Sequence, residues 1–239
     1  MPVWIILVLA IAPGVFWLWF FYQRDTLEPE PKVLIAQTFF RGVLLAIPVL
    51  LVQAPFLFLQ ELFLFVVVAP VTEEIGKYWV VRGGVYNSAE FDEPVDGIVY
   101  AAAAALGFAS IENVGYLLGT YYNTFQLEGN ASASVAVLTL FVVRSLLSVP
   151  GHALWSSLWG YALGVAKFSP PPRRQRLIRD GVMLSILFHG LFNGLLVIFP
   201  PAALGVLIAI PLGWRMTFRR IAAAIAASPH APRKPEDRL

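Results

Sequence analysis

Apolar residues fall into runs of about 20 along this chain, separated by short polar segments. As an α-helix, such a run crosses a hydrocarbon core of about 30 Å at 1.5 Å per residue. The pattern predicts about seven membrane-spanning helices, at approximately residues 2–22, 33–54, 56–81, 95–120, 134–166, 180–199 and 201–218. Pro70 and Gly76 interrupt the third span, and Pro211 would kink the last one. Six spans plus a re-entrant segment is therefore the alternative.

The composition places this pattern in a membrane. Of the 239 residues, 58% are apolar and 13% charged, against roughly 45 to 50% and about 25% in soluble domains. One soluble globule cannot bury this surplus, so we expect an all-α, polytopic helical bundle in the lipid bilayer. The chain has no cysteine, which excludes a disulfide framework, a thiolate metal site and a cysteine nucleophile. No nucleic acid partner is expected.

The basic residues predict the orientation, because Lys and Arg accumulate in short cytoplasmic loops. Fifteen of the 17 lie in the loops, the tail or the span ends on one side of the seven-span layout, and Arg41 and Arg144 are the two that lie deeper within spans. The fifteen are Arg24, Lys32, Lys77, Arg82, Lys167, Arg173, Arg174, Arg176, Arg179, Arg215, Arg219, Arg220, Arg233, Lys234 and Arg238. The prediction is an N-terminus outside and a C-terminus in the cytoplasm.

The two ends of the chain complete the predicted organisation. Residues 1–22 lack a basic segment before their apolar run, which describes a retained anchor better than a cleaved signal peptide. We expect a single transmembrane domain over residues 1–220. Residues 221–239 become rich in proline and charge towards their end, which predicts a short disordered cytoplasmic tail.

The third span carries charged residues, which are costly in a bilayer and therefore functional candidates. Glu73 and Glu74 are adjacent and point about 100° apart on a helix, whereas Glu73 and Lys77 share a face. One carboxylate can pair with the lysine while the other faces a cavity. The alternative is an interfacial Glu–Lys pair that closes the span.

Three further spans carry one ionisable residue each. Glu112 lies about fifteen residues into the fourth span, where a carboxylate must be protonated, paired or bound to a cation. His152 and His189 lie within the fifth and sixth spans, and Asn193 shares the face of His189. An imidazole can bind a metal, accept a proton or donate to an oxyanion. The alternatives are a protonated Glu112 that only donates a hydrogen bond and histidines that only join helices.

A fifth polar cluster lies at the predicted cytoplasmic boundary, where Asp92, Glu93 and Asp96 surround Pro94. We expect mainly solvated carboxylates here, with Asp96 as the member that enters the membrane.

Taken together, the intramembrane residues fall on four successive spans at overlapping depths. Carboxylates and imidazoles that meet in a dry cavity can activate water through a metal, a general base or both. Glu112, His152 and His189 form a possible ligand set for a divalent metal, preferably zinc, with Glu73 or Glu74 as the base. In the competing mechanism a glutamate acts as the base without a metal.

These residues also match family motifs. Glu73 to Lys77 resembles an EExxK motif, Phe108 to Asn113 an FxxxEN motif, and His189 with Asn193 an HxxxN motif. With Asp25 to Pro31 and Phe91 to Tyr100, the chain resembles the PrsW intramembrane proteases, which are related to the CAAX-prenyl-protease and bacteriocin-processing (CPBP) membrane proteases.

The resemblance implies an integral protease of a prokaryotic cell membrane that cuts a membrane-anchored protein, such as an anti-sigma factor. The leading hypothesis is an endopeptidase in which Glu73 or Glu74 activates water and Lys77 holds one of them. His189 and Asn193 would stabilise the oxyanion. The mechanism of the CPBP relatives does not transfer directly, because they have histidine where this chain has Glu112.

Two other function classes use the same residues. A transporter or channel would relay protons or cations through Glu112, the histidines and Arg144. The chain shows no internal repeat of the kind that many transporters have. A membrane scaffold without chemistry is the third class, and it predicts that Glu-to-Gln changes have no effect.

Overall fold

The computed structural model describes residues 1–197 and 200–232, and this part of the chain is helical without strands. The predicted all-α class is thereby confirmed. Its elements are α1 (Val3–Tyr22), α2 (Lys32–Gln53), η1 (Ala54–Phe56), α3 (Glu61–Phe63), η2 (Leu64–Val68), α4 (Ala69–Gly84), α5 (Asp96–Glu128), α6 (Asn130–Val143), η3 (Arg144–Ser148), α7 (Val149–Lys167), α8 (Pro171–Val197), η4 (Pro200–Gly205) and α9 (Val206–Ala226).

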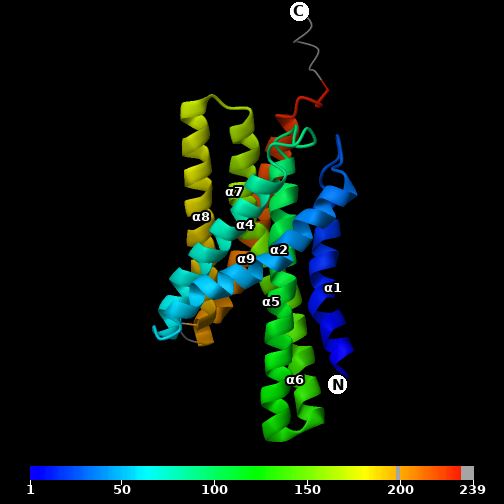
Figure 1. Ribbon diagram of the computed structural model, residues 1–239, viewed down its shortest axis with the longest axis vertical. Helices are drawn as coiled ribbons and strands as arrows, with labels where there is room; N and C mark the ends of the chain where they lie inside the picture. Colours follow the sequence, from blue (N-terminus) through cyan, green and yellow to red (C-terminus); the bar gives the residue numbers. More distant parts are fainter. Residues whose placement is uncertain (198–199, 233–239) are drawn as a thin grey trace, which may run out of the picture.

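Helix α5 is the centre of the bundle, and α1, α2, α4, α6 and α7 pack around it (Figure 1). Every residue from Asp96 to Ser110 is buried. The small side chains of this stretch let neighbouring backbones approach closely. At the crossing with α2, a Cβ atom on Gly42 would collide with the carbonyl oxygen of Ala104, and one on Gly107 with that of Phe39. This close packing holds α5 at the centre of the other helices.

Five helices are long and apolar enough to cross a membrane: Val3–Tyr22, Lys32–Phe56, Asp96–Glu128, Asn130–Lys167 and Pro171–Val197. The predicted spans at 56–81 and 201–218 are also largely helical, but charged residues lower their hydropathy. Residues 69–84 carry two glutamates, a lysine and an arginine, and residues 206–226 carry three arginines. The count of seven therefore stays a prediction, and positions 198 and 199 of the sixth span lie outside the described residues.

The first and the last described residues lie at opposite ends of the molecule (Figure 1). The N-terminus lies at the same end of the molecule as the α5–α6 turn. The last described residues lie at the same end as the α7–α8 turn, which carries basic residues. One predicted marker of orientation is misplaced, because Lys77 is fully buried within the bundle and not in a loop. The other basic loops still favour a cytoplasmic α7–α8 turn.

Cysteine labelling tests this orientation, and the chain has no native cysteine to interfere. Gln126 is exposed near the α5–α6 turn, and Gln175 is exposed in the first turns of α8. In intact cells we expect Gln126→Cys to react with an impermeant thiol reagent and Gln175→Cys to react only after permeabilisation. The reverse pattern would invert the topology.

Two segments of π-helix precede the two helices that carry most of the polar residues. Residues 64–68 lead into Pro70 of α4, and residues 144–148 lead into Pro150 of α7. Proline has no N–H for the preceding turn and its ring crowds the carbonyl four residues earlier. A widened turn just upstream relieves this conflict, and such bulges are frequent at functional sites. These π-helical turns set how α4 and α7 are rotated about their own axes in the residues that follow each proline.

The predicted tail begins inside a helix. Helix α9 continues to Ala226, because Ile221 and Ala224 are buried against the bundle. The prediction of disorder from residue 221 is wrong for this part. Residues 227–232 are described as well, and His230 lies 3.0 Å from a carboxylate oxygen of Glu28. Residues 233–239 lie outside the described part of the chain.

Candidate active site

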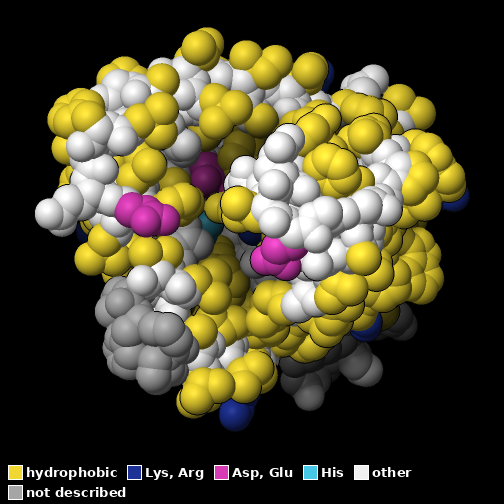
Figure 2. Space-filling model, turned by 90° about the horizontal axis from the view of Figure 1, so that it is seen from below, with side chains coloured by type: hydrophobic (Ala, Val, Ile, Leu, Met, Phe, Trp, Pro, Cys, Tyr) yellow, Lys and Arg dark blue, Asp and Glu magenta, His cyan; other side chains and the backbone are white. Residues whose placement is uncertain are grey.

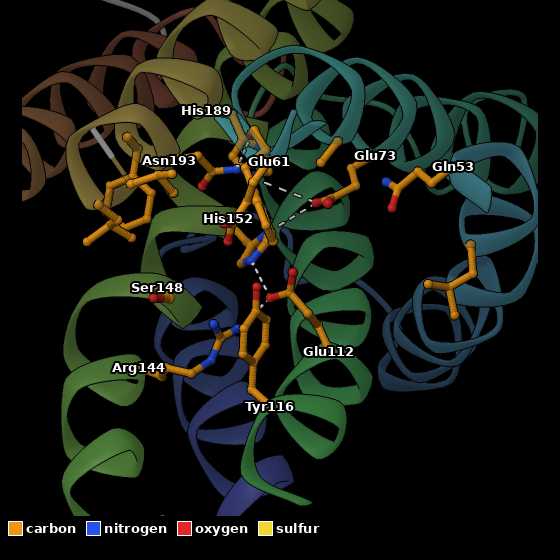
Figure 3. A pocket seen from close by; sticks show the side chains of 16 residues that line it. Gln53, Glu61, Glu73, Glu112, Tyr116, Arg144, Ser148, His152, His189 and Asn193 are labelled. Carbon is orange, nitrogen blue, oxygen red and sulfur yellow. Dashed lines mark hydrogen bonds and ion pairs between the residues drawn. The ribbon is translucent and has the colours of Figure 1, made fainter. Parts of the chain in front are cut away.

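The predicted polar residues meet at one cavity of about 450 Å³. Its walls include Glu73 of α4, Glu112 of α5, His152 of α7, and His189 with Asn193 of α8 (Figure 3). Seen from the end of the molecule where the α5–α6 turn lies, the surface is hollowed, and acidic and histidine side chains are visible inside (Figure 2). The cavity therefore opens towards the end that is predicted to face outward.

Lys77 provides a buried positive charge beside this cavity. Its Nζ donates to Glu73 Oε2 at 3.2 Å and to Glu74 Oε1 at 2.9 Å, and it lies 3.1 Å from His152 Nδ1. An ammonium group has three hydrogens, so these three partners use its full capacity. The sequence predicted that Lys77 holds one of the two glutamates, and in the structure it contacts both.

The two glutamates have different surroundings. Glu74 is fully buried, and its carboxylate accepts from Lys77, Ser156 Oγ at 2.7 Å, Trp159 Nε1 at 3.0 Å and His189 Nδ1 at 2.9 Å. Both of its oxygens are occupied, and it does not line the cavity. Glu73 does line the cavity and has one hydrogen bond, to Lys77. Glu73 is the glutamate that substrate or water can reach.

Glu73, His152 and His189 form a compact group of potential ligands. One side-chain atom from each can be chosen so that all three lie within 4.8 Å of one another. Glu73 Oε2 lies 3.9 Å from His152 Nδ1 and 3.9 Å from His189 Nε2. All three side chains are buried.

Two carboxylates fix which nitrogen of each histidine is free. Glu112 Oε2 lies 3.1 Å from His152 Nε2, and Glu74 Oε1 lies 2.9 Å from His189 Nδ1. An ionised carboxylate only accepts, so the nitrogen facing it carries the hydrogen. The lone pairs are then on His152 Nδ1 and His189 Nε2, which are the atoms nearest Glu73. Metal-binding histidines are commonly oriented by carboxylates in this way.

This donor set fits a divalent metal of the zinc type. Two neutral imidazole nitrogens and one carboxylate are a common catalytic zinc set, and ligand atoms on one tetrahedral ion lie roughly 3.3 Å apart. The 3.9 Å separations are close to this value. A metal on His152 Nδ1 would take the lone pair that now faces Lys77, so the lysine would keep its two carboxylates only.

Glu112, the third predicted ligand, has other contacts here. Its carboxylate pairs with Arg144, whose Nε also donates to Asn113 Oδ1. Its side chain is 25% exposed and lines the cavity. Glu112 contacts Nε2 of His152, whereas Glu73 lies nearest to Nδ1 of the same ring. The structure therefore groups Glu73, and not Glu112, with the two histidines.

Asn193 lies on the cavity wall, one helical turn from His189. Its Nδ2 donates to the carbonyl oxygen of Phe65 at 2.9 Å, within the π-helical segment of residues 64–68. One of its two amide hydrogens is used in this bond, and the other is available to the cavity. The asparagine thus also joins α8 to the segment that precedes α4.

Sequence reasoning missed several contributors. Ser156 and Trp159 follow His152 at i+4 and i+7, so one face of α7 supplies all three, and this spacing was the available signal. Arg144 stood out as an intramembrane charge, but no local pattern connects it to Glu112, 32 residues away.

The expectation of mainly solvated carboxylates at residues 90–96 is wrong for Glu93, whereas Asp96 was the member expected to leave the solvent. Glu93 is fully buried and Asp96 is 1% exposed, because the α4–α5 loop packs against the α1–α2 loop, where Asp25 and Glu30 are also buried. Only Asp92 of the three is partly accessible. This second cluster is separate from the cavity.

A second hollow of about 560 Å³ adjoins the cavity and shares six lining residues with it: Leu50, Gln53, Phe65, Glu73, Glu112 and Tyr116. It runs between α2 and α5, and most of its further lining residues are small or apolar. They are Ala46, Val49, Phe108, Ile111, Gly115, Gly119, Thr120 and Asn123. The cavity therefore has a largely apolar extension between α2 and α5.

Comparison with known proteins shows the family of the chain. Residues 30–216 match the family model described as "PrsW family intramembrane metalloprotease". A protein named Protease PrsW from Geobacillus kaustophilus (strain HTA426) is 36% identical over 197 residues, covering 78% of this chain and 77% of the relative. Protease PrsW from Bacillus subtilis (strain 168) is 33% identical, with 78% and 80% covered. No solved structure gives a significant match.

Proposed function

Because the chain belongs to the PrsW family of intramembrane metalloproteases, we propose that it cleaves single-span, membrane-anchored proteins at the cavity formed by α4, α5, α7 and α8. Anti-sigma factors are one such substrate class. The observation that carries the proposal is the convergence of Glu73, His152 and His189, with both histidines oriented by buried carboxylates. A bacterial cell membrane is the proposed location, since the similar proteins are bacterial.

We assign Glu73, His152 and His189 as the metal-binding residues, with zinc as the metal. Such an ion supplies Lewis-acid polarisation and lowers the pKa of water. Glu74 and Glu112 hold the histidine rings in place. Glu112 also lines the cavity and contacts His152, so it is placed to accept the proton of the attacking water.

Charge that develops on the peptide oxygen needs a donor in the same cavity. Asn193 has a free amide hydrogen there, and we assign this role to it. In the metal-bound form His189 has no hydrogen on the nitrogen that faces Glu73. The predicted oxyanion role of His189 then passes to Asn193.

The hollow between α2 and α5 is the proposed path for the substrate segment, because it is largely apolar and ends at Glu73 and Glu112. Gly119 lines it, and a Cβ atom there would meet no atom within 4 Å. We expect Gly119→Phe to fill the hollow and lower kcat/KM by about tenfold or more, chiefly through KM. Gly83→Phe is the matched control, since Gly83 also has open space around it but lines neither hollow. Equal cleavage by both variants would contradict this path.

The direct test is reconstitution of purified protein in liposomes with single-span substrates, followed by mass spectrometry of the new termini. We expect cuts within or next to the substrate's membrane segment that disappear in His189→Ala. Ion flux in the same liposomes, without cleavage, would favour the transporter class. An unchanged biological effect of Glu-to-Gln variants would favour a scaffold.

A further inference from the structure

The loops at the end of the molecule away from the hollow enclose four buried carboxylates. Asp25 is 3% and Glu30 2% exposed in the loop between α1 and α2, and Glu93 is 0% and Asp96 1% exposed where α5 begins. Oxygens of Asp25, Glu93 and Asp96 can be chosen within 4.8 Å of one another. These four residues are called the acidic cluster below.

Six oxygens of the acidic cluster have no hydrogen-bond partner. They are both carboxylate oxygens of Asp25 and Glu93, Oδ1 of Asp96 and Oε1 of Glu30. Within the described part of the chain, no lysine, arginine or histidine forms an ion pair with any of the four residues. Buried charges are normally paired or bound to a metal, because removing them from water is costly.

The remaining oxygens are held by hydrogen bonds that orient the carboxylates. Asp96 Oδ2 accepts from the backbone N–H groups of Asp92 and Glu93, at 2.8 Å each, and Glu30 Oε2 accepts from Tyr100 Oη. Each of these two carboxylates is thus fixed through one oxygen while the other is left free. Glu30 lies in the α1–α2 loop, as Asp25 does, and it repels both Asp25 and Asp96.

The pKa values of Asp25 and Glu30, the two loop residues, are raised. Burial, followed by repulsion from Glu93, raises the pKa of Asp25 to about 7. Burial raises the pKa of Glu30 to about 8. The hydrogen bond from Tyr100 opposes this rise, and repulsion from Asp25 adds to it. Positive charge inside the acidic cluster would relieve this repulsion.

We propose that the acidic cluster binds a hard divalent cation of the Ca²⁺ and Mg²⁺ class, which ties the α1–α2 loop to the start of α5. The donors are oxygens alone, which suits these ions and not zinc. Asp25, Glu93 and Asp96 contribute five unpartnered oxygens, and water would supply the rest of the six to eight that Ca²⁺ takes. The site is distinct from the catalytic one, and its role is to fix the loop that leads from α4 into α5.

The first test measures thermal unfolding of the full-length protein in detergent after chelation and dialysis, with CaCl₂ or MgCl₂ added back. A saturating cation should raise the Tm by about 5 °C or more, because it binds only the folded state. The shift should vanish in Asp25→Asn and Glu93→Gln and persist in Glu28→Gln, whose side chain is 56% exposed. The shift should also persist in His189→Ala, which separates the acidic cluster from the zinc site.

Terbium binding keeps the proposal testable if a variant is unstable. Tb³⁺ replaces Ca²⁺ and emits when a nearby tyrosine is excited, and Tyr100 contacts the acidic cluster directly. We expect sensitised emission from the chelated protein that excess Ca²⁺ displaces. A Tm that neither cation changes, or emission that is equal in Asp25→Asn, would overturn the proposal and indicate that the carboxylates share protons instead. Removing one carboxylate would then leave the protein equally or more stable.

Discussion

Glu73→Gln is expected to lower kcat/KM for a membrane-anchored substrate by about 10³-fold or more, with little change in the Tm. The side chain faces the cavity, has one hydrogen bond and is the shared neighbour of both histidine lone pairs. Glutamine keeps the shape and removes the charge. Cleavage rates and unfolding temperatures of the same preparation provide the measurement.

Glu74→Gln is the matched comparison, because it alters the neighbouring residue by the same atoms. Its carboxylate accepts from four donors in a fully buried site, and an amide nitrogen would face at least one of them. Breaking such a network removes about 3 to 5 kcal/mol of stability. We expect Glu74→Gln to lose stability together with activity. A Glu73→Gln enzyme within tenfold of the parent, or a Glu74→Gln protein of unchanged Tm, would refute the division of roles.

Removal of the metal is expected to have the second large effect. A strong chelator should reduce cleavage by about 10²-fold or more, and zinc should restore it. Zinc content should fall below about 0.2 per chain in His152→Ala, His189→Ala and Glu73→Gln. It should stay near one per chain in Glu112→Gln, because Glu112 contacts the far nitrogen of His152.

His230→Ala serves as the control for adventitious binding, since His230 lies near Glu28 and Asp92 at the surface. Elemental analysis distinguishes zinc from the calcium or magnesium of the acidic cluster. Loss of zinc in Glu112→Gln with retention in Glu73→Gln would restore the set expected from the sequence, with Glu73 as the base. Full activity of metal-free enzyme would exclude the metal mechanism and support the one in which a glutamate acts as the base without a metal. Lys77 would then keep its contact with His152 Nδ1.

Membership in the PrsW family was recognisable from motifs, because a charged residue inside an apolar run is conspicuous without any structure. Glu73, Lys77, His152 and His189 were found in this way, and all four meet beside one cavity. The helical class followed equally directly, since run length and composition leave no other way to satisfy the backbone in lipid. The number of spans did not follow, because residues 69–84 and 206–226 mix apolar and charged positions.

The choice between Glu73 and Glu74 was beyond the sequence. Adjacent residues on a helix point in different directions, but the rotation of α4 depends on the π-helical turn before Pro70 and on its packing against α8. That rotation turns Glu74 towards Ser156, Trp159 and His189, and leaves Glu73 at the cavity. The same applies to Arg144, whose partner Glu112 lies on a different helix.

The sequence by itself thus determined the class of fold, the family and the residue types of the site, since these depend on local composition and spacing. Tertiary structure decided which residues touch. The acidic cluster is the clearest case, because Asp25 and Glu93 lie far apart in the chain and each resembles an ordinary solvated loop carboxylate. They become buried neighbours only when the α1–α2 loop packs against the start of α5, and packing between distant segments has no signature in local sequence.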